Sequence, residues 1–192
     1  MKLLQSVPSL ALGLCSSCAS ISPVGEASNT LPALVAPEQI RWPVDYQPEK
    51  ATFVVRNRME IAAPPERIWR ELVRAEAWPS WYVGAEGVKV VGSSTGELSP
   101  DSRFAWSTMG LDFTSRVTEF DPPLRLSWES RKAGIQGYHA WLLVPQSGGV
   151  TTVITEETQF GFLAVMQRVF LPNKLRKLHD VWLLELKRRA EA

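Results

Sequence analysis

The chain has 192 residues, 45% of them hydrophobic and 21% charged, which is enough for one folded domain with an appendage but not for two enzymatic domains. Its 21 basic and 20 acidic residues nearly cancel, so no global positive field draws it to nucleic acid. The same composition excludes a largely disordered chain and a protein built mainly of membrane spans.

The N-terminal segment, residues 1–25, has a pattern typical of a short export signal, because residues 3–25 carry no charge and follow Lys2. Cys18 after two serines is a candidate lipid-attachment residue of a lipoprotein leader, and an ordinary N-terminus is the alternative. The segment is too polar and too interrupted by proline to cross a bilayer as a helix. We therefore expect a secreted or membrane-anchored protein, with a cytoplasmic location as the alternative.

Residues 26–50 have linker composition, with four prolines among Ser, Ala and Glu, so we expect the folded domain to span residues 51–191. Alternating apolar residues predict a first strand over residues 53–61, although Asn57 interrupts the pattern. Pro64-Pro65-Glu66 then opens a helix. That helix buries one stripe, which consists of Ile68, Trp69, Leu72 and Val73. A second short helix or turn follows at residues 77–82.

Six further strands are predicted from period-two patterns bounded by Gly, Pro, Asp and Ser, at residues 87–91, 102–109, 111–120, 124–130, 137–144 and 151–160. Because every connection is short, the strands form an antiparallel meander. Two helical segments close the chain, one with Val165, Met166, Val169 and Phe170 and, after Pro172, a long helix with Leu175, Leu178, His179, Trp182 and Leu186 on one stripe. The predicted class is α+β, with a curved seven-stranded sheet wrapped around the long C-terminal helix and two short helices after the first strand.

Four short sequence motifs follow one another along the predicted strands and helices. They are residues 61–69, Trp78-Pro-Ser-Trp81, residues 117–128 and Trp141-Leu-Leu-Val-Pro145. In these motifs residues 51–191 resemble the START-like helix-grip superfamily, also called SRPBCC, and within it the polyketide cyclase/dehydrase-type branch. The resemblance implies the helix-grip fold. It implies much less about activity, because the superfamily includes aromatase/cyclases, lipid and sterol carriers, hormone receptors and chaperone activators.

Eight tryptophans and the inward parity of several strands predict an aromatic chamber between the sheet and the last helix. We expect a void of roughly 300 Å³ or more there, suited to an apolar ring system or acyl chain with a few oxygens. The alternative is that these side chains simply pack against one another as core. The candidate ligand-binding residues are Trp81, Phe104, Trp106, Phe113, Trp128, Trp141, Met166, Phe170, His179 and Trp182.

Acid/base chemistry in this chamber would depend on three candidates, Glu157, His139 and His179. Glu157 shares parity with Val153 and Thr155 on the last strand and is therefore expected to point inward. A carboxylate there is either paired or has a raised pKa. The alternative for all three residues is a structural role, as buried side chains whose hydrogen bonds are made within the protein.

No phosphate-binding, dinucleotide or metal-site motif is present, so we expect neither cofactor nor metal. Cys15 and Cys18 lack the two further ligands that a zinc site needs nearby. Gly92-Ser-Ser-Thr-Gly96 matches the letters of a nucleophile elbow, but a strand rather than a helix follows it, which indicates a hairpin loop.

We therefore expect a monomer that binds, carries or sequesters a small hydrophobic or aromatic molecule. The alternatives are a cyclase, aromatase or dehydratase acting on a polyketide-like substrate, and a protein-binding module resembling chaperone activators. The last of these predicts a packed interior with an exposed apolar patch. Residues 168–189 hold seven basic and two acidic residues, so transient contact with anionic lipid headgroups is a further expectation, with a solvated helix face as its alternative.

Overall fold

The computed structural model describes residues 39–192, so the expected leader over residues 1–25 lies outside the described part. Seven antiparallel strands form one sheet in the order β1-β7-β6-β5-β4-β3-β2, which confirms the predicted meander. The strands are β1 Phe53–Ile61, β2 Glu86–Val90, β3 Arg103–Thr108, β4 Leu111–Asp121, β5 Arg125–Lys132, β6 Ile135–Pro145 and β7 Thr151–Phe160. The first and last strands of the meander pair directly, because β7 returns beside β1.

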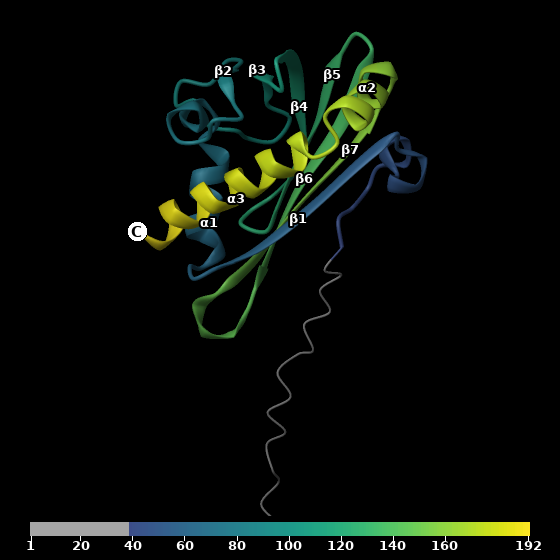
Figure 1. Cartoon of the computed structure of the whole chain (residues 1–192). Helices are drawn as coiled ribbons and strands as arrows, with labels where there is room; N and C mark the ends of the chain where they lie inside the picture. Colours follow the sequence, from purple (N-terminus) through teal and green to yellow (C-terminus); the bar gives the residue numbers. More distant parts are fainter. Residues whose placement is uncertain (1–38) are drawn as a thin grey trace, which may run out of the picture. The chain divides into compact units, whose positions relative to one another are not determined.

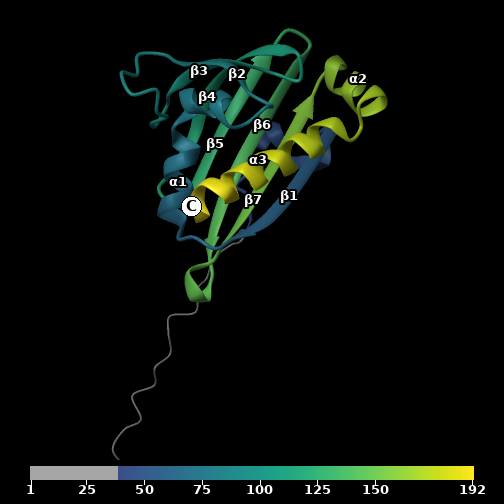
Figure 2. The ribbon, with the colours of Figure 1, turned by 60° about the vertical axis from the view of Figure 1, so that its left-hand side comes forward.

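The helices lie where the sequence pattern predicted them. They are α1 Pro65–Val73, α2 Phe162–Phe170 and α3 Lys174–Glu191, and the short 3-10 turns are η1 Val44–Tyr46, η2 Pro48–Lys50, η3 Ala75–Ser80 and η4 Ser147–Gly149. Figures 1 and 2 show α3 lying across one face of the sheet, with α1 near its C-terminal end and α2 beyond its N-terminal end. This arrangement confirms the helix-grip fold.

Asn57, which interrupts the alternation of β1, anchors the long helix. Its side chain is 8% exposed on the inner side of the strand. The Nδ2 group donates to Asp180 Oδ1 at 2.6 Å and to the Arg176 carbonyl at 3.2 Å, both on α3. Because a buried amide needs partners, this residue fixes where α3 crosses the edge of the sheet.

Residues 39–50 belong to the folded unit, although their composition is that of a linker. Tyr46 is 4% exposed and packs on Tyr138 of β6, with ring centroids 5.3 Å apart. Its hydroxyl donates to Glu129 Oε2 at 3.0 Å. This cover explains why most residues of β6 are buried whichever face they point to, as is usual for a strand covered on both sides. Within the described residues, residues 39–50 cover the outer face of the sheet at β6, and α3 packs on the inner face.

Candidate functional site

An aromatic cluster fills the space between the sheet and α3. Trp182 of α3 lies at its centre, stacked on Tyr82 with ring centroids 4.2 Å apart and 5.1 Å from the centroids of both Trp78 and Trp141. All four side chains are at most 2% exposed. The pocket that remains has a volume of about 30 Å³, so the expectation of a void near 300 Å³ is wrong. The reason is that the indole rings interdigitate at close-packed density instead of standing as walls around a space.

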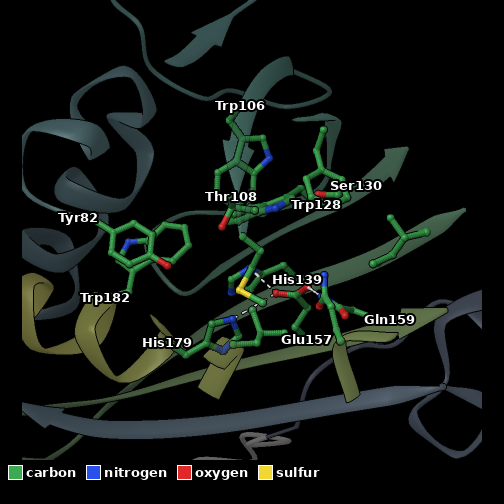
Figure 3. A pocket seen from close by; sticks show the side chains of 16 residues that line it. Tyr82, Trp106, Thr108, Trp128, Ser130, His139, Glu157, Gln159, His179 and Trp182 are labelled. Carbon is green, nitrogen blue, oxygen red and sulfur yellow. Dashed lines mark hydrogen bonds and ion pairs between the residues drawn. The ribbon is translucent and has the colours of Figure 1, made fainter. Parts of the chain in front are cut away.

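The remaining pocket has walls of different chemistry (Figure 3). Its aromatic wall consists of Tyr82, Trp106, Phe113, Trp128 and Trp182. Its polar end consists of Ser130, His139, Glu157, Gln159, Gln167 and His179. The other lining residues, which we call the rim, are Thr108, Met109, Ile135, Gly137 and Leu175. At this size the pocket accommodates about two water molecules and no organic ring without movement of its walls.

Glu157 stands at the centre of the polar end. It is the direct cross-strand partner of His139 between β6 and β7, which places both side chains on the inner face, as the parity of β7 predicted. Its Oε2 lies 3.2 Å from Nε2 of His179 on α3 and 3.4 Å from Nδ1 of His139. Its Oε1 accepts a hydrogen bond of 2.7 Å from Gln159 Nε2. We call His139, Glu157 and His179 the carboxylate cluster.

Electrostatics give His139 and Glu157 different charges. Burial, reinforced by the neighbouring His179, lowers the pKa of His139 to about 3, so this imidazole is neutral at pH 7. Burial alone would raise the pKa of Glu157. The hydrogen bonds from His179 and Gln159 and the proximity of His139 outweigh it and hold the pKa of Glu157 below its ordinary value. The cluster therefore presents an ionised carboxylate beside a neutral imidazole.

The hydrogen-bond network fixes part of the proton arrangement. An ionised carboxylate only accepts, so Nε2 of His179 is the donor to Glu157. His139 Nε2 lies 2.7 Å from Thr155 Oγ1, which holds the ring in place from its other side. The Nδ1 atoms of both histidines are buried without a hydrogen-bond partner in the described residues. The Nδ1 atom of the neutral His139 ring lies 3.4 Å from the Glu157 carboxylate, which is a chemically usable arrangement for proton transfer.

Unpartnered polar atoms are concentrated at this pocket. Within residues 39–192, nine buried side-chain nitrogen or oxygen atoms have no hydrogen-bond partner, and six of them belong to lining residues. The six are Trp128 Nε1, Trp182 Nε1, His139 Nδ1, His179 Nδ1, Gln159 Oε1 and Gln167 Oε1. Each such group costs about 1–3 kcal/mol when it is left unpaired, so their clustering indicates a place where a polar partner binds.

The carboxylate cluster also offers three ligand atoms that lie within 4.8 Å of one another, which raises the question of a metal ion. An imidazole binds a metal along the lone pair in its own plane. The rings of His139 and His179 are stacked, with centroids 4.7 Å apart and planes 22° from parallel. An ion in the plane of one ring therefore lies well off the plane of the other, and shared coordination requires one ring to turn.

The structure brings together seven of the residues that the sequence singled out as candidates. These line the pocket and are Trp106, Phe113, Trp128, His139, Glu157, His179 and Trp182. Phe104 and Trp141 are buried in the core behind it. Trp81 lies at the edge, with the Arg189 guanidinium 5.4 Å from its ring centroid.

Two candidate residues on α2, Met166 and Phe170, do not line the pocket, because the helix turns its other side inward. Phe170 is 70% exposed. The inward side of α2 carries Ala164 and Gln167 instead. Gln167, Gln159 and Tyr82 are lining residues that the sequence reasoning missed. Only Gln159 had a usable signal, because it shares strand parity with Glu157.

The fold has counterparts among known proteins. The family model for polyketide cyclase/dehydrase and lipid transport proteins matches residues 52–191. The chain belongs to this family. Its description covers cyclases, dehydrases and lipid carriers, so a role in ligand binding or cyclase-type chemistry follows at that coarse level. Among proteins with curated descriptions, none is significantly similar to the chain.

Solved structures of similar fold come from several organisms. A hypothetical protein of Helicobacter pylori is 25% identical with a TM-score of 0.74, over 79% of this chain and 96% of its own. A protein of Thermus thermophilus is 20% identical with a TM-score of 0.57, over 72% and 97% of the two chains. Norcoclaurine synthase from Thalictrum, solved with a transition-state analogue, is 12% identical with a TM-score of 0.55, over 71% and 92%. At 20% identity and below, the likeness shows the shared family fold alone.

Proposed function

We propose that this family member binds a small organic ligand, with an apolar or aromatic body and a hydrogen-bonding group, in the pocket between the sheet and α3. The observation that carries the proposal is the set of six buried, unpartnered polar atoms on the lining residues. The set holds donors, at Trp128 and Trp182, and acceptors, at Gln159 and Gln167. A ligand with both kinds of polar group satisfies more of them than a pure hydrocarbon.

Binding requires the pocket to enlarge, and Met109 is a lining residue that lies in a turn rather than in a strand or helix. Met109 and Gly110 form the tight turn between β3 and β4, with φ of 59° and 80°. A left-handed conformation suits glycine but costs a residue such as methionine about 1–2 kcal/mol. The Met109 side chain nevertheless lines the pocket. We infer that this turn swings outward with its methionine when a ligand enters.

Native mass spectrometry of protein purified without detergent tests the binding proposal. We expect a bound small molecule at a stoichiometry of one, released on unfolding. A probe, 2-naphthol, has an aromatic body and one hydroxyl group, and its binding is measurable by calorimetry. If neither a bound molecule nor binding of 2-naphthol is found, the proposal is wrong.

Replacing Met109 with glycine is expected to strengthen 2-naphthol binding roughly tenfold, because it removes a side chain that binding otherwise displaces. The stability should change by less than about 1 kcal/mol, since relief of the left-handed strain offsets the greater freedom of the unfolded chain. Met109→Ala is the matched control, because it also empties the rim but keeps the strain. Wild-type affinity in both variants would show that Met109 does not block the pocket.

A second candidate function, acid/base catalysis on a polyketide-like substrate, is favoured by the carboxylate cluster. Glu157 is an ionised base in an aromatic pocket, and His179 donates to it at 3.2 Å. A carboxylate in this setting is suited to removing a proton from a carbon next to a carbonyl group, and the N–H group of His179 holds the carboxylate in place by donating to it. This candidate predicts that Glu157→Gln abolishes turnover and retains binding, whereas equal loss of both indicates a structural role.

The third candidate, a protein-binding module, predicts a packed interior and an exposed apolar patch. Both features are present, because the aromatic cluster fills the core and α2 exposes apolar side chains. The basic residues around α2, however, favour a different partner for that surface.

A monomeric state remains part of our proposal, and sedimentation equilibrium tests it.

Export of the chain likewise stays a proposal, because residues 1–38 lie outside the described part. Within the described part, no helix combines the length and the apolar character needed to cross a bilayer. Peptide mapping of the mature N-terminus decides the matter. Removal of residues before or at Cys18 would support export, and an intact start at Met1 would contradict it.

A further inference from the structure

The helix α2 turns an apolar stripe away from the domain, with Phe162 and Val169 exposed and Val165 and Met166 half-buried. Phe162, Val165, Met166 and Val169 recur at the spacing of one helix face. In an ordinary surface helix such a stripe faces the core. Here the residues buried against the domain are Ala164 and Gln167, so the apolar stripe lies on the opposite side.

The exposure continues through the end of the helix and into the turn before α3. Phe162 is 67%, Val169 57%, Phe170 70% and Leu171 42% exposed. These four make up half of the eight large apolar residues that the described part of the chain exposes, and they fall within ten consecutive positions. Single exposed apolar residues are normal, but a contiguous group marks a contact surface. We call these four residues the α2 face.

A shallow groove of about 390 Å³ extends this surface onto the first turns of α3. It is lined by Leu171, Pro172, Asn173, Lys174, Lys177, Leu178 and Val181. Apolar side chains and lysine stems make up most of the lining, with the ammonium groups free to reach outward. The α2 face and the groove together form one continuous apolar surface edged by cations.

The charge on this segment has one sign. From Phe162 to His179 the sequence contains four basic residues and no acidic residue. Arg168 and Arg176 donate to the backbone carbonyls of Thr52 and Arg56, and neither forms an ion pair with a carboxylate in the part of the chain that the structure describes. Lys174 and Lys177 form no ion pair within residues 39–192. A basic rim around exposed aromatic and aliphatic side chains is complementary to an anionic lipid surface.

We propose that the α2 face docks on an anionic lipid bilayer. Phe162, Phe170 and Leu171 enter the boundary between headgroups and acyl chains. Arg168, Lys174 and Lys177 contact lipid phosphates. A stable protein partner needs roughly 800 Å² of surface from each side, which one nine-residue helix cannot supply, whereas lipid insertion gains from each side chain separately.

Docking in this position has a consequence for the pocket, and this step alone rests on the proposed function. Gln167 lies on the inward side of α2 and lines the pocket. The α2 face lies on the outward side of the same two-turn helix. A bilayer that holds α2 therefore lies next to the pocket rim, and an apolar ligand can pass between membrane and pocket with little exposure to water.

Co-sedimentation of the full chain with vesicles tests the docking. We expect strong binding to phosphatidylcholine vesicles with about 30% phosphatidylglycerol, weak binding without the anionic lipid, and weakening as salt rises. The double variant F162S/F170S should bind roughly tenfold more weakly, and so should K174E/K177E. Because all proteins compared keep the same N-terminal segment, differences between them report on α2 alone.

Matched controls lie elsewhere on the domain. V83S/V91S removes two apolar residues that are 75% and 71% exposed outside α2, and R67E/R70E makes the same charge change on α1. Both should bind vesicles like the wild type, and thermal melts should match for all five proteins.

Unchanged binding in the two α2 variants, or equal loss in the controls, would overturn the proposal. Self-association that depends on Phe162 and Phe170, without vesicle binding, would overturn it in favour of a protein interface. Vesicle binding is measured without ligand, so its failure would not affect the 2-naphthol experiment, which tests the pocket separately.

Discussion

Replacing Trp182 with alanine is expected to lower the free energy of unfolding by about 3–5 kcal/mol, the usual range for emptying the space of a large buried aromatic residue. Trp182 is 1% exposed and contacts the rings of Tyr82, Trp78 and Trp141. Its loss removes α3 from the centre of the aromatic cluster. Urea unfolding followed by circular dichroism measures the change.

The same variant should acquire a binding site for indole, because the cavity has the shape of the missing side chain and is lined by other aromatic rings. Indole is expected to raise the melting temperature of Trp182→Ala and not that of the wild type. Trp81→Ala is the control, since Trp81 is only partly buried at the edge of the domain and its loss should cost much less. A loss below about 1 kcal/mol for Trp182→Ala would mean that the interior is not packed as described.

Glu157→Gln is expected to cost on the order of 2 kcal/mol at pH 7, because hydrogen bonds to a charged acceptor are worth about 1.5–3 kcal/mol. The amide keeps an acceptor for His179 or for Gln159, but it has no charge and directs an NH₂ group into the cluster. Unfolding in urea at pH 7 gives the comparison with the wild type. If Glu157→Gln left the free energy of unfolding unchanged, the neighbours of Glu157 would not be stabilising its carboxylate.

The pH dependence separates charge from packing in this variant. The folded-state pKa of Glu157 lies below its ordinary value, so its stabilisation is full at neutral pH and is lost as pH falls through the folded-state pKa. His139 adds to the acid sensitivity, because its pKa of about 3 lies below the ordinary 6.5 and unfolding lets it take up a proton. Between pH 5 and 3 we expect the wild type to lose more stability than Glu157→Gln. Parallel loss in both proteins would contradict the ionised state of Glu157.

The fold was predictable because each element carries a local signal that agrees with the global arrangement. The stripe of Ile68, Trp69, Leu72 and Val73 is buried on α1 as the spacing indicated. Glu157 points inward because β7 is a regular strand whose parity fixes every side chain. Asn57 broke the alternation of β1 for a reason that appears only in the tertiary structure, since it bonds to α3.

The site was predicted only in part, because the missing information concerns packing and rotation. The spacing on α2 shows that one face is apolar but does not say which face turns inward. Met166 and Phe170 were therefore expected at the pocket, where Gln167 lies instead. Chamber volume likewise depends on how rotamers of the tryptophans interlock, and residue identity does not encode that directly. The sequence did not predict that residues 39–50 cover β6, because their proline content outweighed the signal of Trp42 and Tyr46, whose rings pack on Tyr138.

The most direct measurement is a titration of the protein with 2-naphthol, followed by the indole N–H signals in proton–nitrogen NMR spectra. The eight tryptophans give separate probes, and single substitutions to phenylalanine assign them. We predict that the signals of Trp128 and Trp182, whose N–H groups are buried without a partner at the pocket, shift on binding, while that of Trp42 on the opposite face of the sheet does not. Saturable shifts of Trp128 and Trp182 would establish that a guest enters between the sheet and α3. Unmoved signals at both, in the wild type and in Met109→Gly, would contradict the account.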